Sequence, residues 1–153
     1  MTKLSYDVIS ALQGFTIVTA ESCTGGGIGA ALTSVPGSSA VYKGGIISYS
    51  NEIKMQLLGV NAETLENIGA VSLEVAKTMA EGARERLHAD YAVSVTGLAG
   101  PEGDSYGNPI GTVYIGFADA NRSIVKHYLF QGSRDEIRDQ SVRAALKLIL
   151  TEI

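Results

Sequence analysis

Short apolar segments alternate with helical patterns along this chain, and this alternation constrains the fold more than any other feature. Strands are predicted where β-branched and other apolar residues run together, over 15–20, 45–49 and 91–96. Because helical segments separate them, these strands are expected to lie in a layered α/β sandwich. Two further strands, 112–118 and 123–130, flank a four-residue turn and predict a hairpin, so the sheet is expected to be mixed.

The helices are predicted from apolar residues at helical spacing and from residues that begin or end helices. The first predicted helix carries Leu4, Val8, Ile9 and Leu12 on one face and stops before Gly14. Further helices are expected over 28–35, from Ser50 or Asn51 to Leu58, from Asn61 to Gly69, after Ser72, and over 137–150. The helix after Ser72 is expected to bury a stripe of Leu73, Ala76, Met79, Ala80, Ala83 and Leu87. Ser133 and Glu136 match a capping box.

The composition bounds the domain organisation and the partners. A chain of 153 residues with 45% hydrophobic residues is expected to form one domain over 1–153, with a packed core. A net charge of -4, with no run of Lys and Arg longer than a pair, disfavours nucleic acid as a partner. No apolar run approaches the roughly 20 residues that cross a bilayer, so no membrane association is expected.

The cysteine and histidine content bears on cofactors and compartment. One cysteine cannot form an internal disulfide, and one cysteine with two histidines is poor material for a zinc site. No metal and no cofactor are therefore predicted. The N-terminal residues lack the apolar stretch and cleavage site of a secretory signal, so a cytoplasmic location is expected.

Three polar junctions follow the three predicted parallel strands: 21–26, 49–54 and 96–111. In open α/β sheets, ligands bind outside the carboxyl ends of the strands. If the strands are neighbours, the three junctions converge on one site.

The first junction places Ser22, Cys23 and Thr24 before Gly25 and Gly26, which open a helix. A hydroxyl on such a turn could act as a nucleophile, with backbone N–H groups of the turn stabilising an oxyanion. Alternatively, Ser22 or Thr24 merely caps the helix. A helix N-terminus lowers the pKa of a thiol, but a cysteine nucleophile usually needs a histidine partner, so a buried structural role is favoured for Cys23.

The other two junctions and the last helix supply candidate base and binding groups. Lys54, which follows Tyr49, is either a solvated lysine or a general base whose pKa burial lowers. The loop with Gly97 and Gly100 is either an anion-binding nest or a plain turn. Two arginines share a face at the start of the last helix, and they either clamp a phosphate or pair with nearby acids: Arg134 and Arg138.

The sequence resembles the CinA C-terminal domain family over nearly its whole length. The most specific segments are Thr19-Ala20-Glu21-Ser22-Cys23-Thr24-Gly25-Gly26 and Thr96-Gly97-Leu98-Ala99-Gly100-Pro101. Further similar segments are Pro36-Gly37-Ser38-Ser39, Tyr49-Ser50-Asn51-Glu52-Ile53-Lys54, Leu58-Gly59-Val60, Gly69-Ala70-Val71-Ser72 and Pro109-Ile110-Gly111-Thr112-Val113. The segment 102–108 departs from the family pattern because it lacks a Gly-Gly pair after Pro101.

The resemblance implies a three-layer α/β/α sandwich with a mixed, mostly parallel sheet, and nicotinamide-nucleotide amidohydrolase activity. It also implies a catalytic Ser22 and Lys54, with Tyr49 nearby. The hypothesis built on them is that Tyr49 orients Lys54 or relays the proton, and that backbone N–H groups of the turn of Cys23, Thr24, Gly25 and Gly26 hold the oxyanion. Thr96 and Arg138 match family positions in the pocket, and the substrate-binding set predicted in full is Ser39, Thr96, Gly97, Gly100, Arg134 and Arg138. Longer family members carry an additional N-terminal nucleotide-processing domain, whose pyrophosphatase activity is not expected here.

The partners expected from these residues are a small nucleotide substrate and further copies of the chain. A catalytically silent nucleotide-binding module is the alternative from another class, because glycine loops suit it equally well. An amidase for another substrate is the second alternative. The combination of Ser22, Tyr49 and Lys54 favours an enzyme, since a binding module needs no nucleophile and base.

Overall fold

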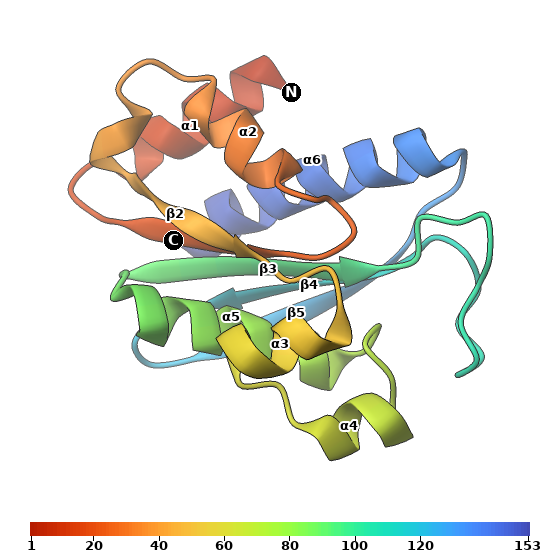
Figure 1. Cartoon of the computed structure of the whole chain (residues 1–153). Helices are drawn as coiled ribbons and strands as arrows, with labels where there is room; N and C mark the ends of the chain where they lie inside the picture. Colours follow the sequence, from red (N-terminus) through yellow and green to blue (C-terminus); the bar gives the residue numbers. More distant parts are fainter.

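Five strands form one sheet that lies between two layers of helices (Figure 1). The computed structural model describes residues 1–153. In chain order the strands are β1 (Ile17–Glu21), β2 (Tyr42–Ile47), β3 (Tyr91–Gly97), β4 (Thr112–Ala118) and β5 (Ser123–Leu129). In space their order is β2-β1-β3-β4-β5. The α/β sandwich predicted from the sequence is confirmed.

The sheet is mixed, as predicted. Strand β1 pairs in parallel with both β2 and β3, whereas β4 is antiparallel to β3 and to β5. Strand β4 is therefore the one strand that runs against the other four. The predicted hairpin of β4 and β5 is confirmed, with Ala118 opposite Ser123 beside the turn.

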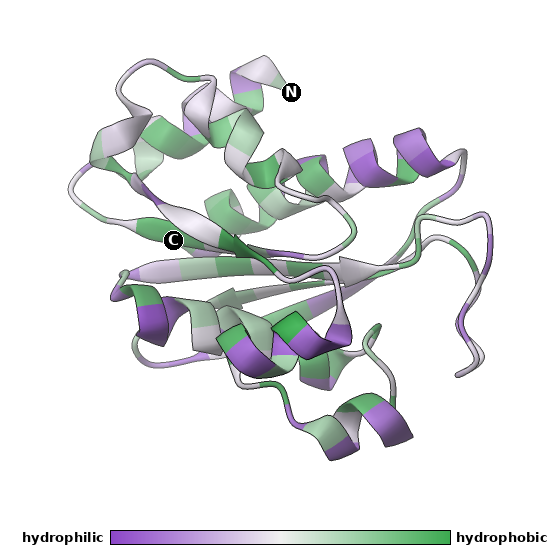
Figure 2. Cartoon of the chain, in the orientation of Figure 1, coloured by the Kyte–Doolittle hydropathy of each residue, from purple (hydrophilic) through white to green (hydrophobic).

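Three helices lie on each side of the sheet (Figure 1). One layer contains α1 (Thr2–Ala11), α2 (Gly27–Thr33) and α6 (Arg134–Glu152), and the other contains α3 (Asn51–Leu58), α4 (Ala62–Asn67) and α5 (Leu73–Leu87). In this second layer α5 packs on the strands, while α3 and α4 pack on α5. A short 3-10 helix, η1 (Ser38–Ala40), links α2 to β2. Along α6, hydrophilic and hydrophobic residues alternate, as in a helix with one face on the sheet and one on the outside (Figure 2). None of the helices is at once long enough and apolar enough to cross a membrane.

The two faces of the sheet carry separate cores. The larger cluster contains Ile17, Ile28 and Leu146, from β1, α2 and α6. The smaller one contains Val18 and Met79, from β1 and α5. Consecutive residues of β1 thus enter opposite cores, as the period of two in a strand requires. A central strand buried on both faces is the rigid support on which the β1–α2 turn is built.

The predicted helix starts agree with the observed caps. The hydroxyl of Ser50 accepts from the N–H of Ile53, and the side chains of Asn61 and Ser72 cap α4 and α5 in the same way. The capping box of Ser133 and Glu136 is present. These bonds satisfy N–H groups that the first turn of a helix leaves unpaired.

Three local predictions are wrong. Leu73 is exposed rather than part of the buried stripe, because it is the first residue of α5 and the buried positions begin at Val75. Strand β2 ends at Ile47, so Tyr49 lies beyond the strand. Helix α6 begins at Arg134, directly after its cap, rather than at Ile137.

A glycine in the middle of α5 lets α3 approach closely. A Cβ at Gly82 would collide with the backbone carbonyl oxygen of Leu58, the last residue of α3. No side chain can stand there without moving one helix away from the other. The position of α3 matters because its first turn carries Lys54.

The carboxyl ends of the three parallel strands reach the same level. Glu21, the last residue of β1, pairs with Ile47 of β2 and with Val95 of β3. The residues that follow, Ser22, Ser48 and Thr96, therefore emerge side by side at one edge of the sheet. The convergence of the three polar junctions expected from the sequence is confirmed.

Candidate active site

The turn that follows β1 holds Ser22 between the sheet and α2. The N–H of Ser22 donates to the carbonyl oxygen of Val95 in β3, at 3.0 Å. The turn closes when the N–H of Gly25 donates to the carbonyl oxygen of Ser22, also at 3.0 Å. Gly25 and Gly26 have φ values of 58° and 104°, in the left-handed region that favours glycine. The sharp turn therefore depends on these two glycines.

Only some of the predicted oxyanion donors are free. The N–H of Gly25 is used within the turn, so this residue is not a donor, contrary to the prediction. The N–H groups of Cys23, Thr24 and Gly26 donate to no protein acceptor. Cys23 follows the nucleophile candidate directly and lines the cleft described below. Its N–H is the best placed candidate for an oxyanion donor.

The buried carboxylate of Glu21 satisfies the start of α2. One of its oxygens accepts from the Thr24 hydroxyl at 2.6 Å and from the N–H of Ile28 at 2.8 Å. The other accepts from the N–H of Gly29 at 3.0 Å. The cap of α2 is thus provided by Glu21, so the interpretation of Ser22 or Thr24 as a simple helix cap is wrong.

Lys54 lies beside Ser22 and is 1% exposed. Its Nζ is 3.0 Å from the Ser22 Oγ. The same Nζ donates to the backbone carbonyl oxygens of Ser48, at 2.8 Å, and of Tyr49, at 3.1 Å. A neutral amine has two N–H bonds and one lone pair. With both N–H bonds directed at the two carbonyls, the lone pair is left for the Ser22 hydroxyl.

The surroundings of Lys54 favour the neutral amine. Burial lowers its pKa from 10.5 to about 8, because the charged form loses its hydration. No carboxylate lies within ion-pair distance of the Nζ. The interpretation of Lys54 as a solvated lysine is therefore wrong, and the arrangement suits a general base that acts near neutral pH.

Cys23 is poorly suited to be the nucleophile. Burial raises the pKa of its thiol to about 11, so the reactive thiolate is scarce at neutral pH. Neither histidine lines the cleft. His88 ends α5, and the ring of His127 stacks on Tyr114, with centroids 4.7 Å apart. The hydroxyl of Ser22, with an amine at hydrogen-bond distance, is the better candidate.

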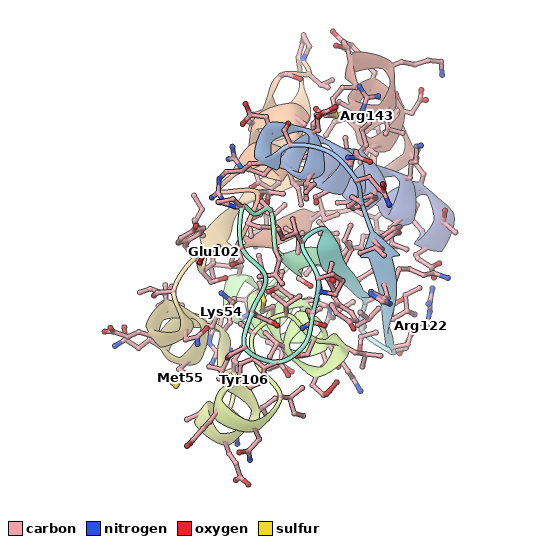
Figure 3. All side chains as sticks on the ribbon, turned by 90° about the vertical axis from the view of Figure 1, so that its right-hand side faces the viewer. Lys54, Met55, Glu102, Tyr106, Arg122 and Arg143 are labelled. Carbon is pink, nitrogen blue, oxygen red and sulfur yellow. The ribbon has the colours of Figure 1, made fainter.

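A cleft of about 310 Å³ opens beside Ser22 and Lys54. Its size lies at the lower end of the range for small-molecule sites. In Figure 3 the loop after β3, which carries Glu102 and Tyr106, faces the viewer, and Lys54 lies behind it. The lining residues come from all three junctions, from the α4–α5 connection and from α6: Ser22, Cys23, Tyr49, Asn51, Lys54, Ala70, Val71, Thr96, Gly97, Leu98, Ala99, Gly100, Glu102 and Arg134.

The loop from 98 to 111, in which the segment 102–108 departs from the family pattern, is fastened to the α4 side of the cleft. The Tyr106 hydroxyl donates to the carbonyl oxygen of Glu66 at 2.7 Å and lies 3.0 Å from that of Leu65. The Asn108 amide donates to the carbonyl oxygen of Val71 at 3.2 Å. These bonds hold the loop against the segment that forms one wall of the cleft.

Tyr49 and Arg134 lie at the mouth of the cleft. The Tyr49 residue is 64% exposed, and its hydrogen bond with Lys54 is made by its backbone carbonyl oxygen. The backbone of Tyr49 therefore orients Lys54, and no hydrogen bond joins its hydroxyl to the amine. The Arg134 guanidinium donates to the carbonyl oxygen of Gly100 and reaches the Tyr49 hydroxyl at 3.4 Å.

Arg138 supports the turn instead of lining the cleft. Its Nε donates to the carbonyl oxygen of Cys23 at 3.0 Å, and its guanidinium also donates to that of Thr24 at 3.3 Å. Arg138 was expected among the substrate-binding residues, but it does not line the cleft. Neither Arg134 nor Arg138 forms an ion pair with a carboxylate, so the second interpretation of these arginines is also wrong.

Of the other predicted binding residues, three line the cleft and one does not. Gly97 and Gly100 line the cleft, and so does Thr96, whose hydroxyl donates to the carbonyl oxygen of Ala70 at 2.9 Å. Ser39 does not line it. It lies in η1, before β2 begins, and hence at the opposite end of the parallel strands. A serine there cannot reach the cleft of its own chain.

A larger hollow of about 730 Å³ lies elsewhere, along α5 and the β4–β5 turn. This turn follows Ala118, which pairs with Ala92 at the start of β3, so the hollow is at the amino end of the parallel strands. Its lining is mostly charged and polar, with neither cysteine nor histidine, and its serine Ser123 donates to Glu81. We therefore place the candidate chemistry in the smaller cleft, where nucleophile and base meet.

The sequence did not predict the parts played by the Glu21 carboxylate and by two backbone carbonyls. Glu21 lies in one of the segments most similar to the family, but no role was predicted for it. A charged residue at the end of an otherwise buried strand is the signal that could have identified it. No sequence pattern could have identified the carbonyl oxygens of Ser48 and Tyr49 as partners of Lys54, because every residue has a backbone carbonyl.

The family model of the CinA C-terminal domain matches residues 1–153. The nicotinamide-nucleotide amidohydrolase PncC of Escherichia coli K12 is 45% identical over 152 residues, which are 97% of this chain and 92% of that protein. A CinA-like protein of Endomicrobium trichonymphae is 52% identical over 134 residues, 88% of this chain but 31% of that protein. The chain thus spans about a third of the length of such longer relatives.

Solved structures share the fold. The competence damage-inducible protein A of Klebsiella pneumoniae superposes with a TM-score of 0.96 at 36% identity, covering 99% of this chain and 95% of that chain. A competence/damage-inducible protein of Agrobacterium tumefaciens superposes with a TM-score of 0.94 at 41% identity, covering 98% and 93%.

The Ser48 hydroxyl supplies a test of the site's architecture. This side chain is 0% exposed, and its Oγ has no hydrogen-bond partner, whereas its backbone carbonyl holds Lys54. A buried hydroxyl without a partner costs about 1–3 kcal/mol. We expect Ser48→Ala to raise the free energy of unfolding, by about 1 kcal/mol in urea titrations.

The matched control is Ser94→Ala. Ser94 is equally buried, but its hydroxyl donates to the carbonyl oxygen of Ala76 at 2.6 Å. This substitution should lower the free energy of unfolding, by about 1 kcal/mol or more. If both variants lost the same free energy of unfolding, this would contradict the finding that the Ser48 hydroxyl has no hydrogen-bond partner.

Proposed function

Because this chain belongs to the CinA C-terminal domain family, we propose that it is a nicotinamide-nucleotide amidohydrolase that uses Ser22 as the nucleophile and Lys54 as the general base. The reaction converts nicotinamide mononucleotide and water to nicotinate mononucleotide and ammonia. The similarity to the Escherichia coli amidohydrolase over 97% of this chain supports the reaction type. The longer relatives contain more than this chain does, so their other activities are not transferred to it.

One observation carries the mechanism, the 3.0 Å contact between the Ser22 Oγ and the buried Nζ of Lys54. A module that only binds nucleotides has no use for an unpaired lysine at 1% exposure, because burying its charge destabilises the fold. An enzyme gains a general base from this burial, because the neutral amine can remove a proton from a neighbouring hydroxyl. The contact therefore favours the enzyme over the silent module.

In the first half of the reaction, Ser22 attacks the carboxamide carbon of the substrate. Lys54 takes the hydroxyl proton as the Oγ–carbon bond forms, and the carbonyl oxygen becomes an oxyanion that the N–H of Cys23 stabilises. When the carbon–nitrogen bond breaks, Lys54 returns the proton to the leaving amide nitrogen. Ammonia departs, and the nicotinoyl group remains as an ester on Ser22.

In the second half, water completes the hydrolysis. Lys54, neutral again, takes a proton from a water molecule that attacks the ester carbon. As the ester bond breaks, the same proton passes to the Ser22 Oγ. Nicotinate mononucleotide leaves, and the serine and the lysine are restored to their starting states. Each half uses the same base, held by the same two backbone carbonyls.

The mouth of the cleft supports binding of the nucleotide part. Arg134 is the cation at the cleft rim, and part of its guanidinium stays available beyond the bonds to Gly100 and Tyr49. We place the substrate phosphate against Arg134, with the ribose along the glycine-rich segment from 97 to 100. Close approach of the ribose there is favoured by the absence of side chains at Gly97 and Gly100.

The proposal extends to partners and compartment. Nucleic acid is disfavoured by the net charge of -4. Pairing of copies is favoured by exposed apolar side chains on both edge strands, Ile47 on β2 and Leu129 on β5. A reducing cytoplasm fits the single free cysteine, Cys23.

Substitutions of Ser22 and of Cys23 distinguish which of these two neighbours is the nucleophile. Ser22→Ala should lower kcat for ammonia release from nicotinamide mononucleotide by several orders of magnitude, at least about 1,000-fold, because no covalent ester can form. The measurement is a coupled ammonia assay, with circular dichroism to show that the variant is folded. Cys23→Ala, which removes a thiol and keeps the backbone N–H, should lower kcat by less than about tenfold. An inactive Cys23→Ala beside an active Ser22→Ala would reverse the assignment.

The pH profile tests the base. Neutral Lys54 is the active form, and its pKa is about 8, so kcat/KM should rise with pH and level off above about pH 8. Lys54→Met should abolish this limb together with most of the activity, whereas Lys43→Met, at an exposed lysine, should leave the profile unchanged. A flat profile in the native protein between pH 6 and about 9 would exclude Lys54 as the base.

A further inference from the structure

The carboxylate of Glu21 is the buried charge nearest in sequence to the nucleophile, and the proposed mechanism gives it no part. Glu21 is 1% exposed and forms no ion pair. Its three donors are the Thr24 hydroxyl and the N–H groups of Ile28 and Gly29. Two of these are backbone groups at the start of α2, where the helix dipole favours a negative charge.

The backbone of Glu21 is held as firmly as its side chain. The residue pairs with Ile47 on one side and Val95 on the other, and its carbonyl oxygen accepts from the N–H of Ser48 at 2.8 Å. Glu21 therefore joins β1, β2, β3 and α2. The five residues from Ser22 to Gly26 span the gap between its backbone and the helix that its carboxylate holds.

The position of the turn decides where the oxyanion donors point. The N–H groups of Cys23 and Thr24 donate to no protein acceptor, and the Thr24 side chain is tied down by Glu21 itself. If the carboxylate were absent, α2 would lose its cap and the Thr24 side chain its anchor, and beyond Ser22 the turn would be held from outside only by the bonds of Arg138 to the carbonyl oxygens of Cys23 and Thr24. A misplacement of about 1 Å is enough to cost about 100-fold in a catalytic step.

We propose that Glu21 is a positioning residue that holds the oxyanion-binding turn in its reactive geometry through the Thr24 hydroxyl and the start of α2. This inference rests on the proposed function, since it assumes that the turn stabilises an oxyanion. Glu21 touches neither substrate nor nucleophile in this role. Its effect is exerted on the transition state and not on binding of the ground state.

Glu21→Gln is the direct test. A carboxamide has one acceptor oxygen and an NH2 group, so it cannot accept from all three donors, and the N–H of Gly29 would face another donor. We expect kcat for ammonia release to fall at least about tenfold while KM stays within about threefold. Glu74→Gln, a matched change at an exposed glutamate in the first turn of α5, should leave both constants unchanged.

The hydroxyl of Thr24 gives a second variant that keeps the buried carboxylate. Thr24→Val removes one of the three bonds to Glu21 and should lower kcat in the same direction by a smaller factor. Thr24→Ser keeps the hydroxyl and should lose less than Thr24→Val. Equal losses in the two Thr24 variants would overturn the part assigned to the hydroxyl.

Binding of a boronic acid tests the role of Glu21 without depending on the proposed substrate. 3-Pyridylboronic acid forms a tetrahedral adduct with a serine hydroxyl and places an oxygen where the oxyanion would lie, with no need for turnover. Glu21→Gln should weaken its inhibition constant or its calorimetric Kd at least about tenfold relative to the native protein and to Glu74→Gln, whereas the Kd of nicotinate mononucleotide should change by less than about threefold.

The outcomes distinguish the two proposals. A native protein that releases no ammonia from nicotinamide mononucleotide, but whose boronate adduct Glu21→Gln weakens, would overturn the proposed substrate and support the role of Glu21. A lower melting temperature of Glu21→Gln, with unchanged kcat and unchanged boronate affinity, would show that Glu21 only caps α2 and would overturn the inference.

Discussion

The hydrogen bond between Lys54 and Ser22 is the interaction on which the account depends. It joins the first turn of α3 to the end of β1, at a distance of 3.0 Å. The amine is buried without a carboxylate partner, which lowers its pKa to about 8 and makes the neutral form accessible. Two backbone carbonyls fix the direction of the amine, and its third bonding position faces the serine.

Much of the fold serves to bring these two groups together. The parallel pairing of β1 with its neighbours places Ser22, Ser48 and Thr96 at one level. On one side of the sheet, Gly82 lets α3 approach α5 closely. On the other side, the carboxylate of Glu21 ties α2 to the strand that carries the nucleophile. The site is thus built from both helical layers, and the central strand is common to them.

The sequence predicted the elements well, because local signals define them. Caps such as Ser72 and Ser133 are short-range features, and so is the periodicity of apolar residues. What it could not predict are contacts between distant segments. In sequence Lys54 looks like a solvated residue in a first helical turn, and its burial depends on the packing of α3 against α5 and on the turn that carries Ser22. Ser39 and Arg138 were expected beside the substrate but do not line the cleft of their own chain, since a residue's place in a motif does not reveal which end of the sheet or which neighbour it faces.

The central claim is that hydrolysis passes through an ester on Ser22, and trapping with hydroxylamine tests it most directly. An acyl-enzyme transfers its acyl group to any small nucleophile that reaches it. Turnover of nicotinamide mononucleotide in the presence of hydroxylamine should therefore yield the hydroxamate of nicotinate mononucleotide beside the acid. The ratio of hydroxamate to acid should rise with the hydroxylamine concentration, and Ser22→Ala should form no hydroxamate. Release of ammonia with no hydroxamate at any hydroxylamine concentration would contradict the claim, because water would then attack the carboxamide directly.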